Sequence, residues 1–165
     1  MIIFISGSIN SGKTTIAKIL HERLENSALV EIDSLHAFVE KWIPIEEAIG
    51  LNLENAAAVI KNFVKHGIDV IVPYPLLKKN YKFLIENLKD ANQQIYFFTL
   101  NPKLEIVLKN RGERKLTDWG KERIKHHYQI GINKPEFGEI IDNSSQAPEQ
   151  TALIVLEKIT QHLCN

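Results

Sequence analysis

The strongest constraint on this chain is an eight-residue segment near its start, Gly7-Ser8-Ile9-Asn10-Ser11-Gly12-Lys13-Thr14. An apolar run at residues 2–6 precedes it, and apolar residues follow at the spacing of one helix face: Ile16, Ile19, Leu20 and Leu24. Glycine lets a backbone turn sharply and approach another group without a Cβ in the way. The segment therefore predicts a tight turn that joins a strand to a helix.

A turn of this kind is suited to binding phosphate. Backbone N–H groups at a helix N-terminus converge on an anion, and the helix dipole favours negative charge there. In this pattern the lysine brings a positive charge to the β- and γ-phosphates and the threonine hydroxyl ligates Mg²⁺. A turn with no ligand is the competing interpretation, and Lys-Thr directly after the second glycine argues against it. We therefore expect ATP and Mg²⁺, the nucleotide being held by Gly7, Ser8, Asn10, Ser11, Gly12, Lys13, Thr14 and Thr15.

Extended and helical signals alternate along the rest of the chain. Short apolar runs predict strands at residues 2–6, 28–32, 68–72, 95–100 and 139–141. Between them, apolar residues three and four apart predict helices, one ending before Gly67 and one starting with Asn101 as N-cap and Pro102 at its first position. Pro148 stands near the start of the last helix. This alternation is typical of a parallel sheet covered by helices on both faces, so we expect an α/β protein with a single domain over residues 1–165.

The second predicted strand leads to Asp33, within Glu31-Ile32-Asp33-Ser34-Leu35-His36. Ligands of open parallel sheets lie beyond the carboxyl ends of the strands, which is also where the Gly-rich turn lies. A carboxylate there can accept the proton of an attacking hydroxyl or hold Mg²⁺. A simple helix cap is the alternative role for Asp33. His36 is a weaker candidate for substrate binding.

A basic segment between two predicted helices, about residues 111–118, is a candidate lid. Arg111 and Arg114 flank Gly112 in it. Guanidinium groups stabilise the charge that develops in phosphoryl transfer, and a loop can bring them to the bound substrates. We predict a catalytic role for Arg111 and Arg114, and leave Arg123 in the next helix undecided.

The third predicted strand ends in Val72-Pro73-Tyr74-Pro75, without the acidic residue that often positions Mg²⁺ at this place. Asp69 stands at the opposite end of that strand. Asp33 is then expected to serve both as base and as partner of a Mg²⁺-bound water, so the metal site depends on Thr14 and Asp33. Tyr74 and Trp42 are candidates for the wall of an acceptor pocket.

The composition limits the partners. The 20 basic residues equal the 20 acidic residues, whereas nucleic-acid binders usually carry a basic excess. The single cysteine, Cys164, cannot form an intrachain disulfide. Neither a signal peptide nor a membrane span is predicted, so we expect a cytoplasmic protein without nucleic-acid or membrane partners. The oligomeric state is not readable from the sequence.

Taken together, the turn, Asp33 and the lid arginines resemble the small-molecule kinases of the P-loop superfamily. Similarity is greatest to the chloramphenicol phosphotransferase-like, gluconate kinase-like and shikimate kinase-like groups, through Gly7 to Thr14, Asp33-Ser34-Leu35-His36 and Ile141-Asp142-Asn143-Ser144. The resemblance implies that Asp33 is the base, that His36 has a role, and that residues 143–147, with Ser144 and Ala147, contact the adenine. We therefore expect the three-layer α/β/α P-loop NTPase fold, with sheet order 2-3-1-4-5 and a short lid, and an ATP-dependent transfer of phosphate to a small-molecule hydroxyl.

Three alternatives stay open. A nucleoside or nucleotide kinase would need basic residues around the acceptor, and in residues 33–53 Lys41 is outnumbered by glutamates. A GTPase-like switch is weakly indicated by Asn133-Lys134-Pro135-Glu136, which has Glu where a guanine-reading segment has Asp. The third alternative is a module that binds nucleotide without catalysis.

Overall fold

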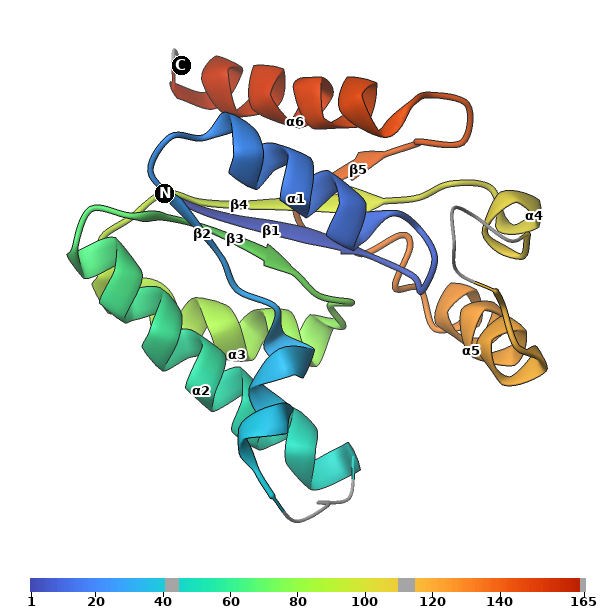
Figure 1. Cartoon of the computed structure of the whole chain (residues 1–165), viewed down its shortest axis with the longest axis horizontal. Helices are drawn as coiled ribbons and strands as arrows, with labels where there is room; N and C mark the ends of the chain where they lie inside the picture. Colours follow the sequence, from blue (N-terminus) through green and yellow to red (C-terminus); the bar gives the residue numbers. More distant parts are fainter. Residues whose placement is uncertain (41–44, 110–114, 164–165) are drawn as a thin grey trace.

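A five-stranded parallel sheet forms the centre of the molecule (Figure 1). The computed structural model describes residues 1–40, 45–109 and 115–163. The strands follow the order β2-β3-β1-β4-β5, as expected, with β1 paired in parallel to β3 and β4. Their bounds are β1 Ile2–Gly7, β2 Ser27–Leu29, β3 Asp69–Pro73, β4 Ile95–Leu100 and β5 Glu139–Ile141.

Helices cover both faces of the sheet, which gives the predicted three layers (Figure 1). On one face lie α1 (Lys13–Arg23) and α6 (Pro148–Leu163), and on the other α2 (Ile45–Lys65) and α3 (Lys78–Leu88). The remaining elements are η1 (Ile32–Phe38), η2 (Lys89–Ala91), α4 (Leu104–Val107) and α5 (Asp118–Gln129). Among the residues described, no helix has both the length and the apolar character needed to cross a membrane.

The strand β1 explains why two cores form. Its side chains alternate between the two faces. Ile2 and Phe4 pack into the core under α2 and α3, and Ile3 and Ile5 pack into the core under α1 and α6. All four are fully buried. A continuous apolar run is what a parallel strand covered on both faces requires.

The end of α2 confirms the role predicted for Gly67. The Ile68 N–H donates to the Phe63 carbonyl and the Gly67 N–H to the Val64 carbonyl, and Gly67 has a φ of 74°. This is the Schellman arrangement, in which a left-handed residue closes the helix.

Two predicted boundaries were wrong. The second strand ends at Leu29, and Asp33 belongs to the 3₁₀ helix η1 instead of the strand end. The helix predicted to start at Pro102 begins at Leu104, because Asn101 continues the sheet: its N–H donates to the Ile141 carbonyl. The Asn101 side chain accepts a hydrogen bond from Asn133 and does not cap a helix.

Candidate active site

A cavity of about 700 Å³ lies beyond the carboxyl ends of the central strands. It joins the Gly-rich turn, the start of η1, the segment after β3, the start of α5 and the segment that leads into α6. Its lining residues are Ile9, Asn10, Gly12, Lys13, Thr14, Thr15, Ile16, Asp33, Pro73, Pro75, Trp119, Asn143, Gln146, Pro148 and Thr151.

The turn between β1 and α1 has the backbone that phosphate binding needs. Gly7 and Gly12 have φ values of 135° and 100°, which L side chains rarely adopt. A Cβ at Gly7 would lie 2.6 Å from the Leu100 carbonyl oxygen and 2.7 Å from Ser11 Oγ. Helix α1 begins at Lys13, immediately after Gly12. Its free N–H groups therefore face the cavity that Gly12 lines.

Lys13, Thr14 and Thr15 bring cation and hydroxyl chemistry to this cavity. Lys13 Nζ donates to the Ser8 carbonyl oxygen at 2.6 Å, so the ammonium group lies over the turn. Thr14 and Thr15 are exposed and line the cavity. These residues fit the triphosphate of a nucleotide, which offers oxygen atoms to N–H, ammonium and hydroxyl donors.

Side-chain hydrogen bonds connect the turn to distant segments of the chain. The Asn10 side chain donates to the carbonyl oxygens of Val107 and Lys109 at 2.8 and 3.0 Å. Buried Asn143, just after β5, donates to the Ser11 carbonyl oxygen at 2.9 Å. Ser8 and Ser11 are themselves buried and do not line the cavity. Their predicted nucleotide contacts are thus left to backbone groups.

His127 on α5 also supports the turn. Its Nδ1 accepts the Ile9 N–H at 3.4 Å and lies 3.5 Å from Ser8 Oγ. Burial lowers the pKa of His127 to about 4, and the positive charges of Arg123, Lys13 and His126 act in the same direction. At neutral pH the imidazole is therefore uncharged and keeps the lone pair that the Ile9 N–H needs.

Asp33 enters the cavity from the first turn of η1. Its side chain is exposed and lines the cavity, and partial desolvation by the surrounding protein raises the pKa of its carboxyl. The positive charge of Lys13 opposes the rise, and Glu31 adds to it. A raised pKa makes a carboxylate a better acceptor of a hydroxyl proton. Asp33 lies beside the P-loop as expected, although η1 and not a strand end positions it.

Tyr74 is buried instead of forming a cavity wall. Its side chain is 5% exposed and it is absent from the cavity lining. Burial, together with the negative charge of Asp33, raises the pKa of Tyr74 to about 12. The flanking Pro73 and Pro75 line the cavity in its place.

The donor set for a metal ion is small. Thr14 and Asp33 line one cavity, and hydroxyl and carboxylate oxygens are ligands that Mg²⁺ accepts. Across residues 1–40, 45–109 and 115–163 no group of three His, Cys, Asp or Glu could hold a metal by itself. The residues fit Mg²⁺, which usually takes several ligands from phosphates and water.

Of the remaining predicted site residues, some do not line the cavity and others lie outside the described residues. His36, Ser144 and Ala147 do not line the cavity. The Ser144 hydroxyl instead accepts the Lys103 N–H at 2.9 Å. Trp42, Arg111 and Arg114, with most of the predicted lid, lie outside the described residues. The end of that segment, Thr117, caps α5 by accepting the Gly120 N–H at 3.1 Å.

Two residues at this site were not predicted from the sequence: Trp119, which lines the cavity, and His127, which contacts the P-loop. His127 could have been found, because the spacing of Gly120, Ile124 and His127 predicts one buried face of α5, and all three are buried. Asn143, within the segment 143–147 expected near adenine, lines the cavity and donates to the Ser11 carbonyl oxygen. No signal in the sequence indicates Trp119, whose position depends on how α5 packs.

The guanine-reading alternative loses its support. The Asn133 side chain is buried and donates to Asn101 Oδ1 at 2.8 Å. Neither Asn133 nor Lys134 lines the cavity. This segment therefore stabilises the end of β4 instead of facing a base.

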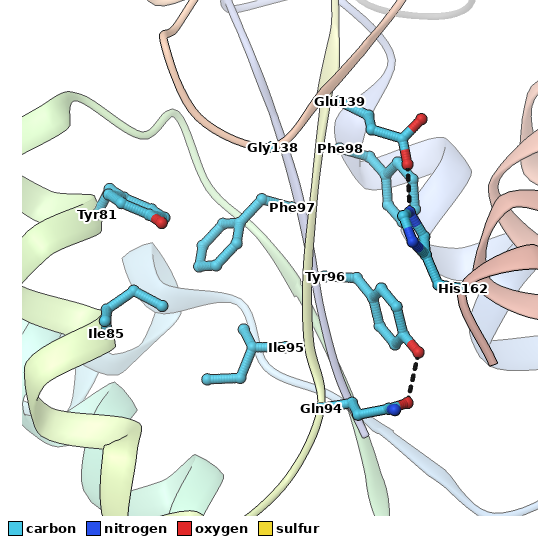
Figure 2. Close-up of a pocket in the computed structure, with 10 residues that line it drawn as sticks. All are labelled: Tyr81, Ile85, Gln94, Ile95, Tyr96, Phe97, Phe98, Gly138, Glu139 and His162. Atoms are coloured by element: carbon cyan, nitrogen blue, oxygen red, sulfur yellow. Dashed lines mark hydrogen bonds and ion pairs between the residues drawn. The ribbon is translucent and has the colours of Figure 1, made fainter. Parts of the chain in front are cut away.

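A second hollow lies over the open edge of β4, away from the P-loop (Figure 2). Phe97 and Tyr81 flank it on one face of the sheet, and Tyr96 and His162 on the other. Its polar groups are paired: Tyr96 O–H donates to Gln94 Oε1 at 2.6 Å, and His162 Nε2 lies 2.7 Å from Glu139 Oε1. The β4 edge thus lacks the converging phosphate-binding groups of the first cavity.

A parallel sheet of this order, with a Gly-rich phosphate loop after its central strand, defines the P-loop kinase fold. No protein-family model matches the chain, and no curated protein is similar to it in sequence. Solved structures share the fold over nearly the whole chain. A sugar kinase from Janibacter sp. HTCC2649 superimposes with a TM-score of 0.71 at 20% identity, over 94% of this chain and 92% of that chain. The APS kinase of Mycobacterium tuberculosis in complex with AMPPNP and APS gives a TM-score of 0.72 at 16% identity, over 96% of each chain. The shikimate kinase of Acinetobacter baumannii in complex with shikimate gives a TM-score of 0.64 at 18% identity, over 98% of this chain and 91% of that chain. The expected likeness to P-loop small-molecule kinases is confirmed for the fold.

Proposed function

We propose that this protein transfers the γ-phosphate of ATP to a hydroxyl group of a small molecule. The observation that carries the proposal is the single cavity that joins the start of α1, Gly12 to Thr15, with the carboxylate of Asp33. Phosphoryl transfer needs a phosphate cradle and a proton acceptor that face the same space.

The cradle end holds the nucleotide. Backbone N–H groups at the start of α1 bind the phosphate oxygens, and Lys13 neutralises charge on the β- and γ-phosphates. Thr14 directly and Asp33 through a water molecule would hold Mg²⁺, which would supply electrostatic stabilisation of the phosphate oxygens. The solved APS kinase binds AMPPNP, which supports ATP as the donor.

Asp33 acts at the other end of the cavity. Its carboxylate accepts the proton of the acceptor hydroxyl as that oxygen bonds to the γ-phosphorus. The bond from the γ-phosphorus to the β–γ bridging oxygen breaks, and ADP leaves with that oxygen. Asp33 then releases the proton to solvent.

The APS and shikimate kinases bind small-molecule substrates, which supports a small-molecule acceptor here. Arg111 and Arg114 stay candidates for stabilising the transferring phosphoryl group. Arg123 is a third candidate, because it lies on α5 near enough to His127 to lower the pKa of that residue.

A panel of hydroxyl compounds tests the proposal, with ADP release above the background hydrolysis rate as the readout. We expect at least one compound to stimulate ADP release and to gain a phosphate detectable by mass spectrometry. Lys13→Ala should abolish turnover and weaken AMPPNP binding. Lys18→Ala, an exposed lysine on the same helix, is the matched control and should keep both.

Two results would contradict the proposal. Full activity of Lys13→Ala would remove the P-loop from catalysis. Far tighter binding of GTP than of ATP in isothermal titration would favour the switch alternative instead.

A further inference from the structure

The face of α5 that runs toward the P-loop carries three residues four positions apart, Trp119, Arg123 and His127. Residues at this spacing share one helix face. His127 contacts the P-loop through the Ile9 N–H. With a rise of 1.5 Å per residue, Arg123 lies about 6 Å and Trp119 about 12 Å farther along α5 from that contact.

Trp119 lines the cavity and yet its side chain is 70% exposed. A tryptophan offers a large apolar surface, and burying it against a flat apolar group is favourable. The cavity contains two other apolar rings, Pro73 and Pro75, on the segment after β3. The cavity therefore offers a ring-shaped ligand apolar contacts beyond the phosphate cradle.

Helix α5, which carries Trp119, lies on a different side of the sheet from the segment expected near adenine. In Figure 1, α5 and η1 lie on the α2–α3 side of the sheet, whereas the loop between β5 and α6 lies on the α1–α6 side. Asp33 belongs to η1, and Asn143 and Gln146 belong to the loop before α6. The helix that carries Trp119 thus lies on the same side of the sheet as the element that carries the candidate base.

We propose that Trp119 determines acceptor specificity by stacking on a planar ring of the acceptor, which is uncharged or positively charged. The charge preference follows from Asp33 in the same cavity and from the negative π-face of the indole, which attracts cations. This inference rests on the proposed function, because it names the acceptor class for the same site. The acceptor is then a hydroxyl compound with an aromatic ring.

Matched ligand pairs test the inference by binding alone. Phenyl β-glucopyranoside and methyl β-glucopyranoside share their hydroxyl groups, but only the first has a planar phenyl ring. Uridine and methyl riboside likewise share their hydroxyl groups, but only uridine has a planar uracil ring. Isothermal titration into the AMPPNP-saturated protein measures each affinity. We expect at least one member with the planar ring to bind ~10-fold more tightly than its methyl partner, in line with aromatic stacking.

Two variants assign that preference to the indole. Trp119→Ala should reduce the ratio to near one, and Trp119→Phe should restore most of it, while AMPPNP affinity changes less than about twofold. Because Trp119 is mostly exposed, both variants should fold, and their AMPPNP binding reports on this.

The outcomes separate the two proposals. A wild-type protein without ring preference, or a preference that survives in Trp119→Ala, overturns the stacking inference. A ~10-fold loss of AMPPNP affinity in Trp119→Ala, with the preference for planar rings intact, would also overturn the inference, because it would place Trp119 on the nucleotide. Ring preference without ADP release from any compound would support the acceptor site and overturn the kinase activity instead.

Discussion

The side-chain amide of Asn10 donates to the Val107 carbonyl oxygen at 2.8 Å, which ties the P-loop to the end of α4. Asn10 also donates to the Lys109 carbonyl and has a φ of 63°, a left-handed conformation that asparagine tolerates better than most residues. One residue thus supplies both a bent backbone and two hydrogen bonds.

Two substitutions separate these contributions. Asn10→Gly keeps the backbone conformation and loses the side-chain bonds, which should cost about 1–2 kcal/mol of unfolding free energy. Asn10→Ala adds left-handed strain of about 1 kcal/mol. Urea unfolding of the two variants measures the difference. Equal stability of Asn10→Gly and Asn10→Ala would show that the conformation of Asn10 costs nothing.

The glycine at the start of the P-loop gives a sharper steric test. Gly7→Ala places a Cβ 2.6 Å from the Leu100 carbonyl oxygen, a backbone atom that cannot easily move. We expect a loss of at least about 2 kcal/mol of unfolding free energy. The control is Gly50→Ala in α2, where no atom lies within 4 Å of the new Cβ. That change should stabilise the protein by up to about 1 kcal/mol, and a loss at Gly50 equal to that at Gly7 would contradict the steric argument.

His127 predicts a dependence of stability on pH. Its pKa is lowered to about 4 in the folded protein, against about 6.5 in an unfolded chain. Between these values the unfolded state binds more protons, so the unfolding free energy falls as pH drops from 6.5 to 4. The loss contributed by His127 is up to roughly 3 kcal/mol and is absent above pH 7.

Unfolding of wild type and His127→Asn at pH 7.5 and pH 4.5 measures this contribution. The stability advantage of wild type over His127→Asn should be larger at pH 7.5. His66→Asn, which removes an exposed imidazole, is the control. An advantage that does not change with pH would show that His127 is not held uncharged.

The sequence predicted the fold well because its signals are local. The apolar runs marked all five strands. The signal has a physical cause in the central strands β1, β3 and β4, because a parallel strand buried on both faces must be continuously apolar. The Gly67 cap was predicted from a signal that is also local, because a glycine directly after an apolar helix face commonly adopts the left-handed conformation that ends the helix. The prediction that Asn101 caps a helix was wrong because Asn101 extends the pairing of β4 with β5, a long-range contact in which its N–H donates to the Ile141 carbonyl.

The site was predicted in part. The phosphate-binding turn and Asp33 lie in one cavity, as the position of ligands in parallel sheets indicates. Tyr74 was expected in the wall and is buried, whereas its neighbours Pro73 and Pro75 line the cavity. His127 and Trp119 come from a helix more than a hundred residues after the P-loop. Spacing along α5 indicates that His127 is buried, but it does not indicate that either residue lies beside the P-loop.

The rate of phosphoryl transfer in Asp33→Asn tests the central claim most directly. Asparagine keeps the shape of aspartate and cannot take the hydroxyl proton, so the single-turnover rate with the acceptor found in the panel should fall at least ~10²-fold. AMPPNP affinity should stay within about threefold, and the exposed control Asp90→Asn should keep the wild-type rate. A wild-type rate in Asp33→Asn would contradict the assignment of Asp33 as the base and, with it, this account of the cavity as a kinase active site.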